Sequence, residues 1–327
     1  MERTRLPYSL FAVCLSALLL ASAGVSFAQS EEERINDVDT ARSIYLVFSN
    51  DLFNKTDQYY TNGLKIGSRS PSFGKGFLKE IHPGFEGAAS YDLGLIQDIF
   101  TPSSTTDTIQ HPSDRPYAAF LALSHKRTTR NKEKRTVWAT EWYVGVMGEW
   151  ALGEVVQTGI HELLPTTSTP LGWDKQIPND IVVNAFLSYA WNFVKHPNAE
   201  LWLRGQGAMG SLFDYVEAGV FARIGWYDSF LDGDDDMPGK WRLFAFIRIF
   251  GRFVIYDATL QGGIILNEKP QRGIANYDLS HFLAEDDFGI EVHYARLGLR
   301  YSYFFRSATF KQGNLHRWNA FTLSWDL

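Results

Sequence analysis

IVVNAFLSYAWNF, residues 181–193, is the stretch of sequence that decides the fold class. Apolar and aromatic residues occupy its odd positions, whereas Asn184, Ser188 and Asn192 occupy even positions. Successive side chains of a β-strand point to opposite faces, so this alternation predicts a strand with one apolar face and one polar face. A soluble sandwich buries its apolar face and a transmembrane barrel turns it towards lipid, and alternation by itself fits both.

The same alternation returns along the whole chain, in strands of about ten residues with aromatic residues at their ends. Three features favour the transmembrane barrel: the strand length, the aromatic residues at the strand ends, and a final strand that runs to the last residue. We expect twelve strands, at 42–50, 60–70, 89–99, 114–127, 135–148, 180–194, 200–211, 215–228, 241–256, 284–295, 296–307 and 316–327. The predicted fold class is therefore all-β: an antiparallel transmembrane β-barrel, about twelve strands, with a short helix in an extracellular loop. Closure removes the sheet edges that would otherwise aggregate.

The first residues predict export. Arginines in MERTR precede an apolar run and a small-residue end, VSFA, as in a secretory signal peptide. We expect cleavage after Ala28, which gives a signal peptide at 1–28 and an outer-membrane barrel at 29–327; an uncleaved anchor would need a longer apolar run. Cys14 is the only cysteine, so the mature chain would have no disulfide. The net charge of −6, without a cluster of Lys and Arg, argues against a nucleic-acid partner.

Charged residues lie on the polar faces of several predicted strands. We expect them to fill the lumen with ion pairs rather than leave an open pore. These residues are Glu141, Glu217, Arg223, Arg248, Arg252 and Arg300. If the N-terminus is periplasmic, every connection after an odd-numbered strand is extracellular, and the outer connections of such barrels are the longer ones. The long polar segments that follow odd-numbered strands are 51–60, 101–114, 149–179 and 257–283.

Two predicted strands flank the polar stretch NDLFNKTDQYYTNG (50–63), which carries more hydrogen-bonding groups than a turn needs. Hairpin geometry brings Asn50 and Asp51, at the end of one strand, beside Thr61, at the start of the next. A carboxylate, an amide and a hydroxyl can hold Ca²⁺ through oxygen ligands, orient a water or stabilise an oxyanion. Alternatively, the asparagine and aspartate cap a turn, and the two tyrosines before the threonine belong to an aromatic girdle.

A short helix is predicted within the loop at 149–179. GEVVQTGIHELL lies between Gly153 and Pro165 and carries His161. Histidine is the side chain best suited to take up a proton near neutral pH, so His161 is a candidate general base; alternatively, it is a surface residue on a helix that packs on the rim. The chain has no G-x-S-x-G or H-E-x-x-H motif and no cysteine nucleophile, which excludes several standard hydrolase classes.

Five ordered blocks of the sequence carry a resemblance. They are ND-x-x-x-x-x-D-x-Y-Y-T-N-G at 50–63, Q-D-I-F-T-P at 97–102, D-R-P-Y-A-A-F-L at 114–121, E-V-V-Q-T-G-I-H-E-L at 154–163 and G-W-D-K-Q at 172–176. With these blocks the chain resembles the outer-membrane lipid A 3′-O-deacylase family, whose members are twelve-stranded barrels that remove an acyloxyacyl chain from lipopolysaccharide. The resemblance covers essentially the whole mature chain.

The resemblance implies a role for each matching residue. Asn50 and Asp51 match the essential Asn-Asp pair of the family, Thr61 its essential hydroxyl residue, and His161 its catalytic histidine. It also implies Ca²⁺ dependence and chemistry in the manner of a secreted phospholipase A2. His161 would then activate a water for attack on the 3′ ester, with Ca²⁺ near Asp51 and Asn50 stabilising the oxyanion and Thr61 orienting the water or the ester. In a rival version, Thr61 is the nucleophile and His161 its base.

This sequence departs from the family in two places. At least one member has adjacent basic residues in the loop after the third strand, where they would meet a phosphate of lipid A, and here the loop 101–114 has no Lys or Arg. Arg115 and Lys175 are the candidates for phosphate contacts in their place. Barrels of this kind usually end in an aromatic residue, whereas this chain ends in Leu327, with Trp325 as the candidate to replace it.

The expected function is hydrolysis of the 3′-linked acyloxyacyl chain of lipid A, by a monomer in the cell outer membrane whose site faces the cell surface. The alternatives are an outer-membrane phospholipase, which shares the chemistry, and a non-enzymatic barrel that serves as a narrow channel or scaffold. The esterase requires His161 close to Asn50, Asp51 and Thr61. The channel requires a continuous polar lumen and has no use for that cluster.

Overall fold

The computed structural model describes residues 41–51, 58–106, 113–163, 170–227, 229, 231, 241–271 and 273–327. The predicted signal peptide (1–28) and the tip of the first hairpin (52–57) lie outside the described residues. No helix in the described part of the chain is both long and apolar enough to span a bilayer.

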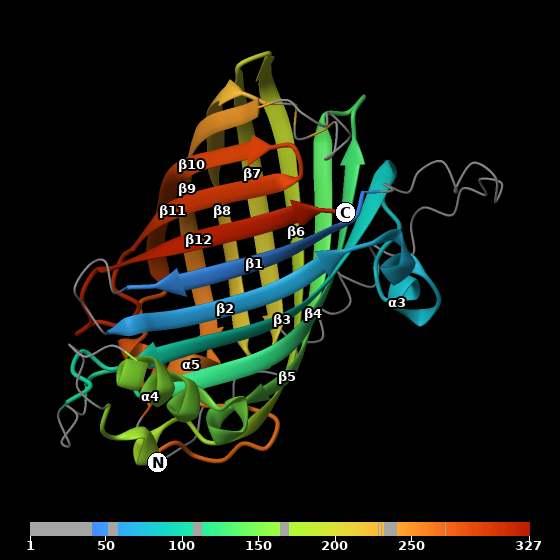
Figure 1. Ribbon diagram of the computed structural model, residues 1–327. Helices are drawn as coiled ribbons and strands as arrows, with labels where there is room; N and C mark the ends of the chain where they lie inside the picture. Colours follow the sequence, from blue (N-terminus) through green and yellow to red (C-terminus); the bar gives the residue numbers. More distant parts are fainter. Residues whose placement is uncertain are drawn as a thin grey trace.

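Twelve antiparallel strands form one closed barrel, as predicted (Figure 1). Each strand pairs with its neighbours in the chain, and β1 pairs with β12 to close the ring. The strands are β1 (Ser43–Asn50), β2 (Tyr59–Arg69), β3 (Ala88–Thr101), β4 (Ala118–Asn131), β5 (Thr136–Met147), β6 (Asp180–His196), β7 (Ala199–Gly210), β8 (Phe213–Trp226), β9 (Trp241–Asp257), β10 (Phe282–Tyr294), β11 (Leu297–Arg306) and β12 (His316–Asp326).

The predicted boundaries agree with these strands to within a few residues, except at β4. The sequence placed that strand at 114–127, and it runs from Ala118 to Asn131. Pro116 has no N–H to donate to a strand ladder, so the strand begins only after it.

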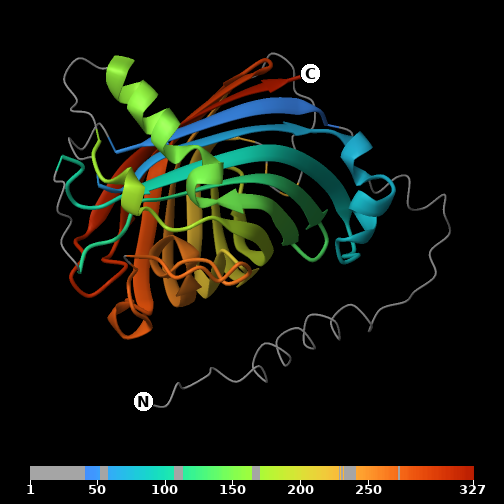
Figure 2. The ribbon, with the colours of Figure 1, turned by 90° about the horizontal axis from the view of Figure 1, so that it is seen from below.

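The two ends of the barrel differ. One end, here called the terminal end, holds the start of β1 and the C-terminal Leu327 (Figure 1). The other, the helical end, holds the helices α4 (Gly153–Leu163) and α5 (Ala258–Gln261) (Figures 1 and 2). The long polar connections predicted to share one side therefore do lie at one end of the barrel.

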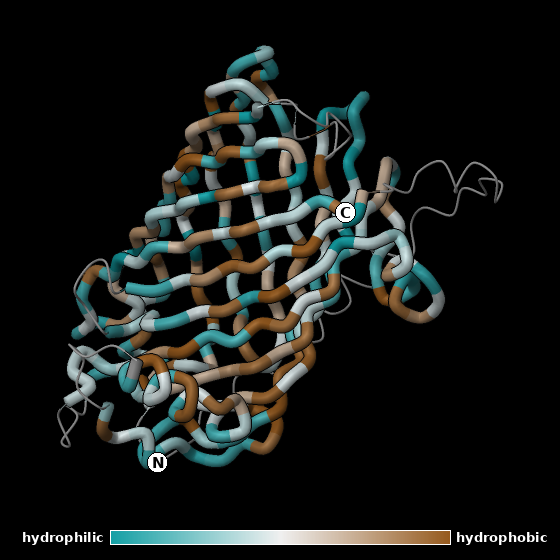
Figure 3. The backbone as a smooth tube through the Cα atoms, viewed as in Figure 1, coloured by the Kyte–Doolittle hydropathy of each residue, from teal (hydrophilic) through white to brown (hydrophobic). Residues whose placement is uncertain are grey.

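Hydropathy alternates along the strands (Figure 3), and the outer face of the wall is apolar. Large apolar side chains at outward positions are well exposed, among them Ile44, Leu46, Phe48, Leu123, Val144, Val216, Ile224, Ile249, Leu299 and Leu323. Exposed aromatic residues gather near the terminal end, namely Trp191, Trp226, Trp241, Tyr294 and Trp325. An apolar outer band with an aromatic girdle is the surface of a transmembrane barrel.

The lumen is filled by ion pairs, as predicted. Arg252 lies between two carboxylates, with N···O distances of 2.6 Å to Glu217 and 3.3 Å to Glu285. The other predicted lumen charges are paired in the same way: Glu141 with Lys65, Arg223 with Glu200, Arg248 with Asp287 and Arg300 with Glu291.

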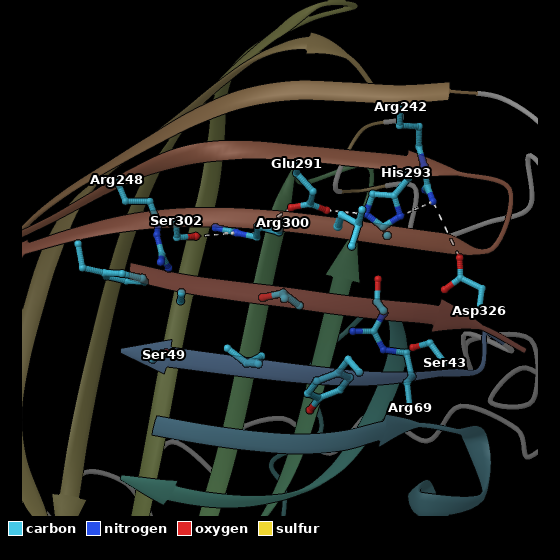
Figure 4. A pocket seen from close by; sticks show the side chains of 18 residues that line it. Ser43, Ser49, Arg69, Arg242, Arg248, Glu291, His293, Arg300, Ser302 and Asp326 are labelled. Carbon is cyan, nitrogen blue, oxygen red and sulfur yellow. Dashed lines mark hydrogen bonds and ion pairs between the residues drawn. The ribbon is translucent and has the colours of Figure 1, made fainter. Parts of the chain in front are cut away.

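The lumen changes in character along its axis. Along β1 and β12 it holds a polar cavity of about 400 Å³, whose lining runs from Ser43 to Ser49 and includes Arg69, Arg242 and His293 (Figure 4). Towards the helical end, buried apolar residues pack inside the wall, and Ala258 of α5 joins them. They include Ile96, Phe100, Phe120, Met147, Val182 and Leu212.

The connection between β2 and β3 folds back along the outside of the wall near the terminal end. It contains a 3-10 turn, η2 (Pro71–Gly74), and the single-turn helix α3 (Phe77–Glu80). His82 lies between Thr140 and His125, with ring nitrogens 2.5 Å from the hydroxyl and 2.7 Å from the second imidazole. Burial lowers the pKa of His82 to about 3, so this histidine is neutral at physiological pH.

The lumen ion pairs give a first prediction. Replacing Arg252 by Met leaves Glu217 and Glu285 without their shared cation, and breaking a buried pair in this way costs about 3 kcal/mol. We expect Arg252→Met to unfold at a clearly lower urea concentration in folded-versus-unfolded electrophoretic mobility. Arg296→Met, at an exposed turn, is the matched control. Equal midpoints for the two variants would show that the lumen pairs do not stabilise the barrel.

Candidate active site on the outer wall

Helix α4 lies against the outer face of the wall at the helical end (Figure 2). Ile99 of β3 points away from the lumen, because the next residue, Phe100, packs inside it. The cluster beneath the helix is almost fully buried and consists of Ile99, Tyr117, Ala119, Ala151 and Trp173. The helix therefore sits on the side of the wall that faces lipid and not in the mouth of the barrel.

Two side-chain hydrogen bonds fix the position of α4. The indole Nε1 of Trp173 donates to Oε1 of Gln157 on the helix at 2.9 Å, and both side chains are buried. Nε2 of Gln97, on β3, donates to the backbone oxygen of Ala151 at 2.6 Å, just before the helix begins. These bonds attach both the start and the middle of the helix to the wall.

Gly153 allows this close approach. A Cβ atom there would lie 2.5 Å from Cβ of Ala119 and 2.7 Å from the ring of Trp173, both closer than real contacts allow. Gly159, two turns later on the same helix, has nothing within 4 Å of such a Cβ. Glycine is thus required at the first position for packing.

His161 lies one turn beyond Gln157, as predicted, within α4. Residues four apart share one side of a helix, so His161 lies on the side that Gln157 turns towards the wall. The side chain is half-buried. The structure therefore places His161 outside the wall and at the helical end.

Thr61 lies at an irregularity in β2. The register with β3 shifts between Tyr60 and Asn62, which leaves Thr61 as the extra residue of a bulge. The Thr61 Oγ1 atom lies 2.6 Å from Oγ1 of Thr101, and both residues are buried. Bulges re-aim side chains and are frequent beside active sites. Tyr59, two residues before Thr61, has a φ of 65°, which is unusual for a non-glycine residue and marks the same irregularity.

The two tyrosines before Thr61 do not lie in the outer girdle. Tyr60 points into the lumen, where its hydroxyl donates to Asp98 at 2.9 Å. Tyr59 packs in a buried cluster with Leu260 and Phe310. The alternative that they belong to the aromatic girdle is wrong, because the bulge and the positive φ turn them into the core.

Asn50 and Asp51 end β1 at the helical end. Asn50 is paired in register with Asn62 of β2, next to Thr61. Asp51 is 1 % exposed, and its Oδ2 accepts a hydrogen bond from the backbone N of Gln58 at 3.0 Å. This bond closes the base of the hairpin, so Asp51 stabilises the turn, as the alternative interpretation of this residue proposed.

The structure thus brings Asn50, Asp51 and Thr61 together at the ends of two adjacent strands. It places His161 at the same end of the barrel and outside the same wall (Figures 1 and 2). That these four residues act together on a substrate stays a prediction.

The two basic candidates lie in different places. Arg115 is buried, with its guanidinium 4.5 Å from the ring centroid of Phe100 and hydrogen-bonded to Thr259 of α5, so it points into the lumen. Burial lowers its pKa to about 10, which leaves it charged at neutral pH. Lys175 is half-buried in the 3-10 turn η4 (Trp173–Lys175), next to α4 on the outside. Of the two, Lys175 is on the side of the wall where α4 lies.

The donor set on the first hairpin suits a hard cation. Asn50, Asp51 and Thr61 offer an amide oxygen, a carboxylate and a hydroxyl, which are the oxygen ligands that Ca²⁺ takes. Within the described ranges, no group of three or more His, Cys, Asp or Glu side chains could hold a metal ion.

Two neighbours of the predicted residues carry part of this arrangement and were not predicted. Thr101 is hydrogen-bonded to Thr61, and Asn62 is paired with Asn50. Thr101 lies in the sequence block 97–102, and Asn62 lies in the block 50–63. Their involvement follows from strand register and from the bulge, neither of which the sequence pattern specifies.

Comparisons with known proteins agree with this architecture. The model of a family described as outer membrane protein LpxR matches residues 10–327. Among solved structures, LpxR from Salmonella typhimurium has a TM-score of 0.70 and 18% identity, covering 86% of this chain and 99% of that one. An outer membrane channel from Pseudomonas putida F1 is 11% identical, with a TM-score of 0.45 over 88% of this chain and 96% of that one. No curated protein sequence matches the chain.

The packing of α4 gives a second prediction. One added methyl group in Gly153→Ala would collide with Ala119 and Trp173, whereas the same group in Gly159→Ala meets open space and favours the helix. We expect faster hydrogen exchange across α4 in Gly153→Ala, measured by mass spectrometry, and unchanged or slower exchange in Gly159→Ala. Equal exchange in both variants would mean that the helix is not held by this contact.

Proposed function

Since the chain belongs to the outer membrane protein LpxR family, we propose that it is an outer-membrane esterase that hydrolyses the 3′-linked acyloxyacyl chain of lipid A. One observation carries the proposal. A helix that bears a histidine is packed on the lipid-facing side of the wall, at the end of the barrel where a carboxylate, an amide and a hydroxyl meet. An enzyme whose substrate is a membrane lipid needs its reactive groups on that side.

The proposed chemistry uses His161 as the general base. Its imidazole takes a proton from a water molecule, and the resulting hydroxide attacks the carbonyl carbon of the 3′ ester. The tetrahedral intermediate collapses, the bond between the carbonyl carbon and the sugar oxygen breaks, and the histidine returns its proton to the leaving alkoxide. The products are a free acyloxyacyl acid and a 3′ hydroxyl on the sugar.

Thr61 has two possible parts in this scheme. Its Oγ1 is 2.6 Å from that of Thr101, so the pair can hold a water or the ester in a fixed orientation. In the rival scheme, the same hydroxyl attacks the ester and forms an acyl-threonine that water then hydrolyses. An acyl adduct on Thr61 in intact-protein mass spectra during turnover would support the rival; a protein mass that stays unmodified supports water.

Asn50 and Asp51 are the residues proposed to hold Ca²⁺. When bound, the ion would stabilise negative charge on the carbonyl oxygen of the ester. Asp51 is buried and already fixed by Gln58, so its carboxylate is oriented before any ligand arrives.

The other functions have weaker support. A channel requires a continuous polar lumen, whereas the described lumen becomes apolar and densely packed towards the helical end. A phospholipase would use the same chemistry, and the substrate comparison below separates the two. We also propose that the helical end faces the cell surface, since outer-membrane barrels have their longer connections on that side.

The proposed base gives a third prediction. In cells that express the protein, lipid A should lose the mass of one acyloxyacyl group, and His161→Ala should abolish this loss. Removing a general base lowers rates by about 10² to 10⁴-fold. Glu162→Ala, at the exposed next position, is the matched control and should act like the wild type. Full deacylation by folded His161→Ala would refute the role of this histidine.

The proposed cation site gives a fourth prediction, with a readout independent of activity. Calorimetric titration of Ca²⁺ into the detergent-solubilised barrel should show binding at one site. We expect Asp51→Asn to weaken this affinity at least about tenfold, because Ca²⁺ affinity depends on the charge of its ligands. Unchanged affinity in Asp51→Asn would place the cation elsewhere.

A further inference from the structure

Three asparagines form a row across the outer face of the wall at the helical end. Asn50 of β1 is paired in register with Asn319 of β12 on one side and with Asn62 of β2 on the other. Their chain neighbours Ser49 and Ala320 line the lumen cavity, so the asparagines point outwards. Phe48 and Phe321, the next outward residues along β1 and β12, are exposed parts of the apolar band.

Two of these amides are buried and incompletely hydrogen-bonded. Asn319 is 1 % exposed and Asn62 is 4 % exposed. Nδ2 of Asn319 and Oδ1 of Asn62 have no hydrogen-bond partner among the described residues. A buried polar atom without a hydrogen-bond partner is unfavourable, so two of them beside the proposed site point to a bound molecule.

The orientation of Asn319 is fixed by a neighbour. The hydroxyl of Tyr301, on β11, donates to Oδ1 of Asn319 at 2.6 Å. Because this bond occupies the amide oxygen, the NH₂ group is the end left free. A free N–H group cannot bind a cation, so the partner that it lacks is an acceptor atom.

We propose that Asn319 and Asn62 are substrate-binding residues that recognise an acceptor and a donor close to the scissile ester. This inference rests on the proposed esterase function. Nδ2 of Asn319 would donate to a carbonyl oxygen of the substrate. Oδ1 of Asn62 would accept from an N–H or O–H group of the same molecule.

This pair of groups selects a class of lipid. In an acylated amino sugar, an amide N–H stands on the ring carbon next to the carbon that bears the ester, so donor and acceptor come together. The ester region of a glycerophospholipid has carbonyl oxygens and no donor. A site built to bond a donor rejects an analogue that lacks it, because the acceptor of the protein is then left unpaired. Asn62 is therefore the residue that favours lipid A over a phospholipid.

The fifth prediction tests this directly. Purified variants should be assayed on lipid A and on phosphatidylcholine, which has no hydrogen-bond donor, in the same detergent micelles. We expect Asn319→Leu and Asn62→Leu each to lower kcat/KM for lipid A about tenfold, mainly through KM, since tenfold corresponds to one hydrogen bond. Asn62→Leu should also reduce the preference for lipid A. Tyr301→Phe, which frees the amide of Asn319 to turn, should have a smaller effect.

Controls separate the possible failures. Leu323→Ala changes an exposed apolar residue of β12 on the same face and should leave both activities unchanged. If the wild type is active and kcat/KM for lipid A is unchanged in Asn319→Leu and Asn62→Leu, this inference is overturned. The proposed function is then unaffected. Wild type that folds and cleaves neither lipid would overturn both. Weaker Ca²⁺ binding in Asn62→Leu would make Asn62 a metal ligand and overturn its assignment to the substrate.

Discussion

The wall of this barrel is a single layer of β-sheet, and the rest of the structure depends on that constraint. Each residue of a strand faces either lipid or lumen, with no third option, and a shift by one residue exchanges the two sides. Apolar residues such as Leu46 and Leu323 therefore form the outer band, and charges such as Arg252 and Glu217 meet inside. Inside the lumen a charge can pair with a charge on another strand, whereas outside it would face hydrocarbon.

Against that rule, the polar residues on the outer face at the helical end are exceptional. Asn50, Asn62, Asn319 and Thr101 lie at outward positions, and three of the four are almost fully buried. The lumen charges form ion pairs, as expected of a packed interior. Asn62 and Asn319 each have one buried polar atom without a hydrogen-bond partner, as expected of a site that binds a molecule from the membrane side.

Strand periodicity made most of the fold predictable. All twelve strands, the lumen charges and α4 follow from patterns of period two or 3.6 within single segments. The sequence patterns do not predict the side of the wall on which α4 packs. That side depends on the contact of Gly153 with Ala119 and Trp173, which are far apart in the sequence. The direction in which the Arg115 side chain points could not be predicted either, because its contacts with Phe100 and Thr259 involve two other elements.

The candidate site shows the same division. Asn50, Asp51 and Thr61 were predictable as neighbours, because a hairpin joins the strand ends on which they stand. Asn319 was not, since β12 meets β1 only through closure of the ring. Closure therefore does more than remove two edges: it brings the last strand beside the first and completes a row of amides that neither hairpin has alone. In an open sheet Asn319 and Asn62 would lie at opposite edges, so this part of the site exists only in the closed barrel.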